Sequence, residues 1–227
     1  MDQIQLGTDT TFADNPENRC LCVLVLDTSG SMAGEPIAQL NAGLVALKDE
    51  LMSDPLAQKR VEIAIVTFGP VTELQTSVTA ENFVPPSLSA SGDTPMGAAL
   101  LKAVEIVDGR KQAYRSAGVK YYRPWIMLIT DGGPTDVNQP TWADGTARVR
   151  DGVEKKAFAF FPIGVEGAQM EKLASISQSV TPIKLKGLQF RDLFKWLSSS
   201  LKSVSQSRPG EEVQLVNPTT PSGWGTV

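Results

Sequence analysis

The sequence predicts an α/β fold with a central, mostly parallel six-stranded sheet, one antiparallel edge strand and helices on both faces. Short apolar, β-rich runs alternate with segments whose apolar residues recur at helical spacing. Strands that alternate with helices usually lie parallel, and the helices then cover both faces of the sheet. Only Pro70 separates one pair of runs, which leaves no room for a crossover, so the second run should turn back as an antiparallel edge strand.

Each predicted strand is a β-rich run bounded by turn residues; the six runs are Cys20–Asp27, 61–69, 71–79, 124–133 with its loop, 157–165 and 181–186. The first is apolar at almost every position, as in a strand buried on both faces. Each predicted helix has apolar residues along one side; the segments are 36–51, 94–107, 143–156, 170–177 and 190–204. Thr94 should lie at the N-cap of its helix or just before it.

The chain is predicted to comprise a polar N-terminal arm (1–18), one α/β domain (19–207) and a tail rich in Pro, Gly and Thr (208–227). The arm lacks the basic and apolar regions of a secretory signal, and no apolar run approaches the roughly 18 residues of a membrane span, so we expect a cytoplasmic location. The tail carries apolar residues suited to docking on the domain or on a partner; they are Val213, Leu215, Val216 and Trp224.

Composition excludes several functional classes. A net charge of −4 gives no strong attraction to nucleic acid or to anionic membranes, so neither is an expected partner. The chain has no histidine, which rules out Ser-His-Asp and Cys-His catalysis and a histidine-based zinc site. Cys20 and Cys22 are poorly spaced for a disulfide, and we interpret them as small buried residues of a reducing compartment.

Oxygen-bearing side chains gather at the predicted carboxyl ends of strands. Asp27, Ser29 and Ser31 occupy alternate positions where the first strand ends, Thr94 precedes a helix, and Asp131 directly follows another apolar strand. Ligands of open α/β sheets collect at this edge of the sheet. Two carboxylates and three hydroxyls are hard donors, which suit Mg²⁺ better than zinc or copper. The sequence therefore predicts a metal site and no catalytic residues.

The motifs "DTSGSM", "GDTPMG" and "LITDGG" resemble the three parts of the metal-ion-dependent adhesion site (MIDAS) of von Willebrand factor A domains. The resemblance implies a Rossmann-like sheet and a bound Mg²⁺, with Mn²⁺ or Ca²⁺ as substitutes. It implies Ser29, Ser31 and Thr94 as direct or near-direct ligands, and Asp27 and Asp131 as ligands acting directly or through water. One coordination position would stay open for an Asp or Glu carboxylate of a protein partner.

Longer stretches, among them "YYRPWIMLITDGGPTD" and "LKGLQFRDLFKWLSSSL", resemble bacterial intracellular members of this family from tellurite-resistance and related stress or phage-defence clusters. The resemblance covers residues 19–213. Such proteins are often encoded beside a protein kinase and a PP2C-type phosphatase, so partners of these kinds are implied.

Two alternative functions remain open at this point. In a metal-stabilised scaffold the ion would only order three loops, without bridging to a partner. A metal-assisted phosphohydrolase would need a general base, for which Glu35 and Asp136 are the nearest candidates. A dehalogenase-type phosphatase would also need an acid two positions after Asp27, where this chain has Ser29. We therefore expect a binding module and not an enzyme.

A basic segment, residues 110–123, precedes the strand that ends at Asp131. Such runs are usually solvated helix ends and loops. A second hypothesis is that its side chains form a surface for acidic or phosphorylated partners, at the opposite end of the sheet from the metal; they are Arg110, Lys111, Arg115, Lys120, Tyr121, Tyr122 and Arg123.

Overall fold

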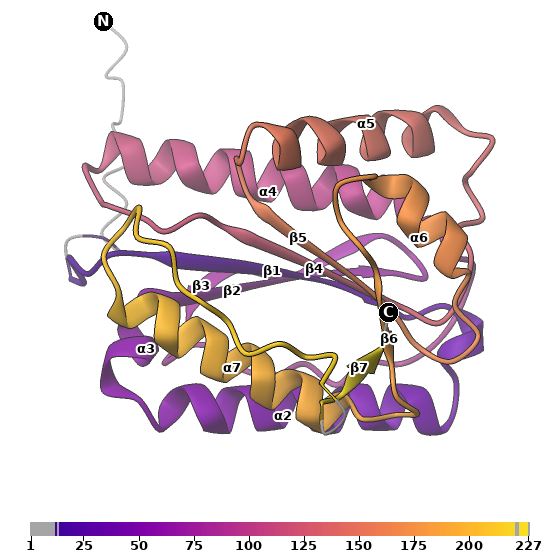
Figure 1. Cartoon of the computed structure of the whole chain (residues 1–227), viewed down its shortest axis with the longest axis horizontal. Helices are drawn as coiled ribbons and strands as arrows, with labels where there is room; N and C mark the ends of the chain where they lie inside the picture. Colours follow the sequence, from indigo (N-terminus) through magenta and orange to yellow (C-terminus); the bar gives the residue numbers. More distant parts are fainter. Residues whose placement is uncertain (1–11, 13, 221–222, 227) are drawn as a thin grey trace, which may run out of the picture.

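A seven-stranded sheet forms the centre of the molecule, in the order β3-β2-β1-β4-β5-β6-β7 (Figure 1). This computed structural model describes residues 12, 14–220 and 223–226. The strands are β1 (Cys20–Asp27), β2 (Val61–Phe68), β3 (Thr72–Thr79), β4 (Trp125–Thr130), β5 (Ala159–Gly164), β6 (Ile183–Leu185) and β7 (Gly225–Thr226). The helices are the 3-10 turn η1 (Gly30–Met32), α2 (Glu35–Met52), α3 (Pro55–Arg60), α4 (Met96–Ser116), α5 (Pro140–Glu154), α6 (Met170–Ile176) and α7 (Phe190–Gln206).

The sheet is mostly parallel, as the sequence predicts. β3 pairs antiparallel with β2 after the turn at Pro70, which confirms the predicted edge strand. The predicted count of six strands is wrong, because the tail adds β7 at the other edge, antiparallel to β6. A two-residue strand carries no periodicity, so the sequence pattern contains no sign of it.

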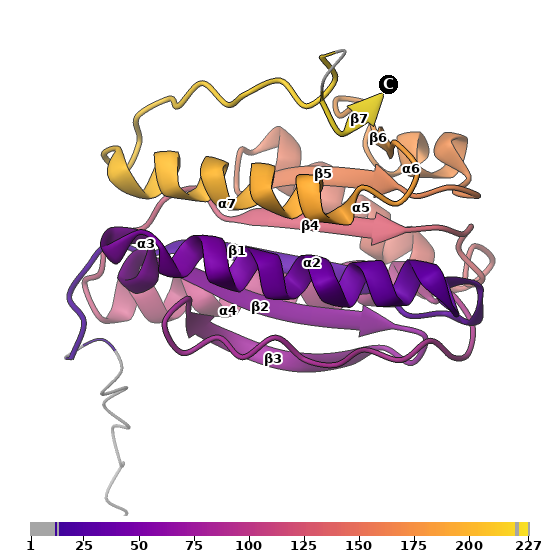
Figure 2. The ribbon, with the colours of Figure 1, turned by 90° about the horizontal axis from the view of Figure 1, so that it is seen from below.

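The helices form two layers, with α2, α3 and α7 on one face of the sheet and α4, α5 and α6 on the other (Figures 1 and 2). All eight residues of β1 are buried, and its side chains alternate between the layers. Even-numbered residues pack into the core that includes α2 and α7, and odd-numbered residues pack into the core that includes α4. Within the described part of the chain, no helix is long and apolar enough to span a membrane.

Helix α3 has no counterpart among the predicted helices. Six residues are too few for a periodic apolar pattern, and its formation depends on local signals. Asp54 is the N-cap: its carboxylate accepts the backbone N–H groups of Leu56 and Ala57 at 2.9 and 2.8 Å. Pro55 occupies the first helical position, where its missing N–H costs nothing.

The C-terminal tail docks on the domain at some of the residues that the sequence singles out. Trp224 is 4% exposed and packs against Trp196 of α7 at a ring distance of 5.5 Å. Leu215 packs against the core, whereas Val216 is 73% exposed and does not join the core. Most of the predicted N-terminal arm lies outside the described residues.

The basic segment 110–123 is not uniformly solvated, contrary to expectation. Arg110 donates from Nε and Nη2 to the buried carboxylate of Glu62 at 2.7 and 2.8 Å. Tyr114 donates to the same carboxylate at 2.6 Å, and Arg19 forms an ion pair with it at 2.9 Å. Periodicity cannot reveal this because the acid comes from β2, far away in the sequence. The Arg110 guanidinium therefore neutralises the buried carboxylate of Glu62.

Two glycines of α4 give opposite predictions for the same substitution. A Cβ at Gly97 would lie 2.4 Å from the Cα of Trp142 in α5, so Gly97→Ala must push the two helices apart. We expect it to lower the free energy of unfolding by about 1–3 kcal/mol. A Cβ at Gly109 meets nothing within 4 Å, and Gly109→Ala should raise stability by about 0.5–1 kcal/mol.

Urea unfolding of both variants measures these changes. Equal midpoints for Gly97→Ala and Gly109→Ala would contradict the close packing of α4 on α5.

Candidate metal centre

The predicted site lies where the carboxyl ends of β1 and β4 meet. Asp27 is the last residue of β1, and Asp131 directly follows β4, its neighbour in the sheet. From β1 the chain continues to β2 on one side, whereas from β4 it continues to β5 on the other. Such a reversal of strand order opens a crevice beyond the strand ends, where α/β sheets bind their ligands.

Asp27 is fully buried, and its carboxylate joins the ends of the two strands. The backbone N–H of Ser29 donates to Oδ1 at 2.8 Å, and Thr130 Oγ1 donates to Oδ2 at 2.5 Å. The pKa of Asp27 is raised, mainly because burial disfavours the charged form; the charge of Asp131 adds to this, while the hydrogen bonds from Ser29 and Thr130 oppose it. A cation in the crevice would favour the ionised carboxylate.

Ser29 and Ser31 connect the end of β1 to the loop after β4 through side-chain hydrogen bonds. The hydroxyls of Ser29 and Ser31 lie 3.1 Å apart, and Ser31 Oγ donates to Asp131 Oδ1 at 2.7 Å. Ser29 is 2% exposed, whereas Ser31 is exposed. The side-chain oxygen atoms therefore form a series from the buried Asp27 through Ser29 to the exposed Ser31. A ligand that enters from solvent would meet Ser31 first.

Thr94 belongs to the same constellation. Its backbone N–H donates to Thr135 Oγ1 at 3.1 Å, and the Thr135 N–H donates to the Thr94 carbonyl at 2.9 Å, so the second and third loops are joined. A Cβ placed on Gly132 would lie 3.7 Å from Thr94 Oγ1 and 3.9 Å from Ser31 Oγ. The space beside Gly132 is therefore shared by two of the predicted ligand hydroxyls, and the structure brings all five predicted residues into one region.

The first two loops approach closely because glycine lies at both contact points. The Gly30 N–H donates to the Gly92 carbonyl at 3.0 Å. Gly92 has a φ of +76°, in the region that favours glycine, and a Cβ there would lie 2.9 Å from the carbonyl oxygen of Gly69. A side chain at Gly92 would therefore push the loop of Thr94 away from the turn at Gly69, whereas a Cβ at Gly30 would lie at an ordinary contact distance of 3.6 Å from the Gly92 carbonyl oxygen.

Thr130 and Thr135 support the site but are absent from the sequence-based set. Both hydrogen-bond to predicted ligand residues, one through Asp27 and the other through the Thr94 backbone. The only signal for Thr130 is a polar residue at the last position of an apolar strand. Thr135 has no such signal, because its role depends on how two loops meet in space.

The N-cap position of α4 is Pro95, and Thr94 precedes it without capping the helix. Asp136 satisfies the helix end instead: its carboxylate accepts the N–H groups of Gly97 and Ala98 at 3.2 and 3.1 Å. It also accepts the Thr141 hydroxyl at 3.0 Å and is 1% exposed. A carboxylate held by three donors is poorly suited to act as the general base of a hydrolase.

The donor set fits a hard cation. Within the described residues, no group of three or more His, Cys, Asp or Glu side chains could hold a metal ion. An ion in this crevice would therefore depend on two carboxylates, three hydroxyls and water. Oxygen donors of this kind are typical of Mg²⁺ sites, whereas zinc prefers nitrogen and sulfur ligands.

Comparison with known proteins agrees with this fold. A family model described as von Willebrand factor type A domain matches residues 22–186, most of the chain. Human inter-alpha-trypsin inhibitor heavy chain H4 is 27% identical over 213 residues, which cover 86% of this chain and 22% of that protein. The chain thus spans about a fifth of the length of this curated relative.

Two solved structures share the fold at low identity. The pilus adhesin SpaC of Lactobacillus rhamnosus GG, in an open conformation, superposes with a TM-score of 0.61 at 12% identity, over 83% of this chain and 31% of that one. Proximal thread matrix protein 1 of the mussel byssus, with a zinc-occupied MIDAS motif, gives a TM-score of 0.51 at 14% identity, over 84% of this chain and 49% of that one.

Removal of the Asp136 carboxylate should show its role as a helix cap. Asp136→Ala leaves the Gly97 and Ala98 N–H groups without their acceptor, so we expect a loss of about 1–2 kcal/mol in the free energy of unfolding. Asp93→Ala, at an exposed carboxylate of the preceding loop, should change stability by less than about 0.5 kcal/mol. Guanidinium unfolding compares them, and similar losses would refute the capping role.

Proposed function

The chain belongs to the von Willebrand factor type A domain family, and we propose that it binds Mg²⁺ at Asp27, Ser29, Ser31, Thr94 and Asp131 in order to capture a carboxylate of a protein partner. The observation that carries this proposal is the convergence of three loops on one crevice. Ser31 bonds to Asp131 across that crevice, and Thr94 Oγ1 faces the same space beside Gly132. Domains of this family are typically metal-dependent protein-interaction modules.

Each residue has a distinct part in the proposed site. The hydroxyls of Ser29, Ser31 and Thr94 would be direct or near-direct ligands, since neutral oxygens leave the ion with residual positive charge. Asp27 and Asp131 would act directly or through water. A bound Mg²⁺ supplies an open coordination position, and the remaining charge favours an Asp or Glu side chain of the partner there.

The choice of metal follows from the donors. The mussel byssus protein shares this fold and holds zinc at its MIDAS motif, so the fold is compatible with a divalent cation. The present residues offer only oxygen, so we propose Mg²⁺, with Mn²⁺ or Ca²⁺ as substitutes. The family is usually non-enzymatic, and we propose a binding role without catalysis.

The biological setting of the proposal rests on sequence resemblance. The stretches of this sequence that resemble bacterial tellurite-resistance and phage-defence proteins are the basis for proposing a stress-related role, with a protein kinase and a PP2C-type phosphatase as candidate partners. A cytoplasmic location is part of the same proposal, in agreement with two buried cysteines that are free thiols. The metal-stabilised scaffold is the alternative, and it differs in predicting no partner carboxylate at the ion.

Metal binding should appear as a gain in stability. At a Mg²⁺ concentration of about 100 times Kd, binding to the folded state adds about 2.7 kcal/mol. For a domain of this size, each kcal/mol raises Tm by roughly 2–4 °C. Thermal unfolding with Mg²⁺ and with EDTA should show this shift in the wild type, and Asp27→Ala and Thr94→Ala should lose it. Ser87→Ala, an exposed hydroxyl earlier in the Thr94 loop, should retain it.

Partner capture distinguishes the interaction module from the scaffold. Affinity capture from the native host in Mg²⁺, followed by elution with EDTA, should release a protein whose binding Thr94→Ala also abolishes. Replacement of one Asp or Glu on the purified partner should then weaken binding at least tenfold. Capture that survives both EDTA and Thr94→Ala would exclude a metal-bridged mechanism.

A further inference from the structure

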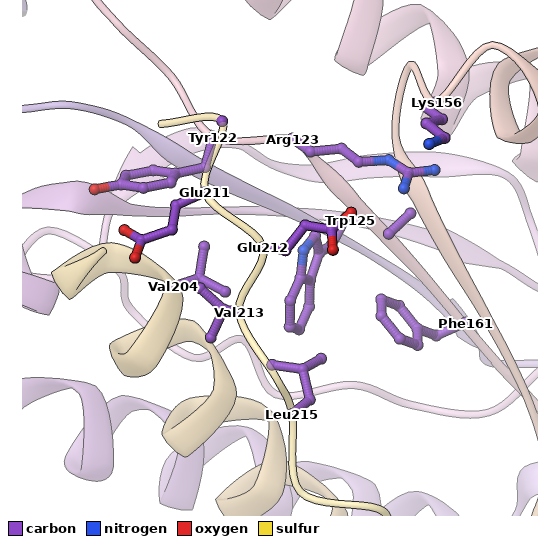
Figure 3. Close-up of a pocket in the computed structure, with 12 residues that line it drawn as sticks. Tyr122, Arg123, Trp125, Lys156, Phe161, Val204, Glu211, Glu212, Val213 and Leu215 are labelled. Atoms are coloured by element: carbon purple, nitrogen blue, oxygen red, sulfur yellow. The ribbon is translucent and has the colours of Figure 1, made fainter. Parts of the chain in front are cut away.

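A second concave site lies at the end of the sheet opposite the candidate metal centre. It is a half-open cavity of about 600 Å³ between the start of β4, the start of β5 and the C-terminal tail (Figure 3). Trp125 is the first residue of β4 and Ala159 is the first of β5, whereas Asp27 and Asp131 lie at the carboxyl ends of strands. Occupation of this cavity would not require the metal.

The cavity exists because β6 is short. Ile163 and Gly164 are the β5 residues that pair with β6, so the first half of β5 has no strand beside it on that side among the described residues. The tail crosses this region instead, and its residues from Gly210 to Leu215 form one wall (Figure 3).

Two anchors hold this tail wall in place. Before it, the Tyr122 hydroxyl lies 2.9 and 2.7 Å from the carbonyl oxygens of Ser205 and Ser207 at the end of α7. After it, the Trp196 indole N–H donates to the Val216 carbonyl at 2.7 Å. The cavity is therefore preformed, which lowers the entropic cost of binding.

The lining combines an apolar floor with charges of opposite sign at its edges. Trp125 and Phe161 lie 4.9 Å apart between ring centres, and Val204, Val213 and Leu215 complete the apolar part. Figure 3 shows Arg123 and Lys156 together on one side of the cavity and Glu211 on the other. Glu212 projects over Trp125, between them (Figure 3).

The two cations have no acidic partner among the described residues. Arg123 donates to the Phe158 carbonyl at 2.5 Å, which leaves most of its guanidinium N–H groups available. Partial desolvation lowers the pKa of Arg123, so an anion beside it would be favourable. Glu211 and Glu212 share this lining without an ion pair to either cation, so an acidic group of a partner can still pair with Arg123 and Lys156.

Lys156 has an unusual backbone conformation for a lysine. Its φ is 54°, in the left-handed region, and it is the only non-glycine residue with positive φ in the described part of the chain. It follows the end of α5, a position where glycine is the usual residue. The chain therefore presents a lysine side chain to the cavity where glycine would suit the backbone better, which points to a use for the amine.

We propose that this cavity binds an extended segment of a partner protein in which bulky apolar side chains separate an acidic residue from a basic one. The apolar side chains would lie on Trp125 and Phe161, the acid would meet Arg123 and Lys156, and the base would meet Glu211. A volume of about 600 Å³ is in the range of ligand pockets and holds a few side chains, not the face of a folded domain. Charges of both signs around an apolar floor match such a segment better than a simple anion.

Short synthetic peptides test this proposal. The probes are the capped tetrapeptides Asp-Phe-Leu-Lys and Lys-Leu-Phe-Asp, both used because the direction of the segment is not set by the lining. Titration into the labelled protein is followed by NMR at the Trp125 indole signal. We expect at least one peptide to bind, and its affinity to fall at least fivefold when Asn replaces its Asp, when Gln replaces its Lys, or when Ala replaces both apolar residues.

Lys156→Gly separates binding from folding. Because glycine suits the backbone, the variant should unfold at an equal or higher temperature, yet bind the peptide at least fivefold more weakly. Lys155→Ala is the control, since that exposed lysine pairs with Asp151 and does not line the cavity. Absence of binding by both peptides at millimolar concentration, or unchanged affinity in Lys156→Gly, would overturn the proposal.

A third experiment tests whether the cavity binds the peptide independently of the metal centre. Peptide binding should be the same in Mg²⁺ and EDTA, and in Thr94→Ala, because the cavity lies at the other end of the sheet. Loss of peptide binding in EDTA would overturn an independent site, whereas loss of metal binding alone would refute only the proposed function.

Discussion

The structure depends on a carboxylate at the end of a strand that is buried on both faces. Asp27 cannot reach solvent, and its oxygens are satisfied by the Ser29 N–H and the Thr130 hydroxyl. The first bond turns the chain as it leaves β1, and the second ties β1 to β4 where the strand order reverses. An unpaired buried carboxylate would be costly, so this pair of bonds constrains both loops together.

The remaining site geometry follows from that constraint. With the loops after β1 and β4 held together, Ser31 reaches Asp131, and Thr135 joins the Thr94 loop to the same group. Close backbone contacts at Gly69 and Gly92 bring the loops within reach of one another. Preorganisation of this kind would leave little reordering for the proposed cation to impose.

The two ends of the sheet differ in the kinds of side chain that they bring together. At the carboxyl ends of the strands, loops bring together oxygen atoms around a point suited to a cation. At the amino ends, short β6 and the anchored tail leave an apolar cavity with Arg123, Lys156 and Glu211 at its edges. The two ends of the domain therefore offer different chemistry, and of the two proposed sites only the one at the carboxyl ends of the strands would need a metal ion.

Sequence alone determined the alternation of elements, the antiparallel edge at Pro70 and the five candidate ligands, because periodicity and strand-end polarity are local. Tertiary structure alone decided the pairing of Glu62 with Arg110, the cap that Asp136 provides to α4, and the strand β7. It also decided the cavity beside Lys156. Each of these joins residues far apart in the chain, and no local pattern encodes which distant groups will meet.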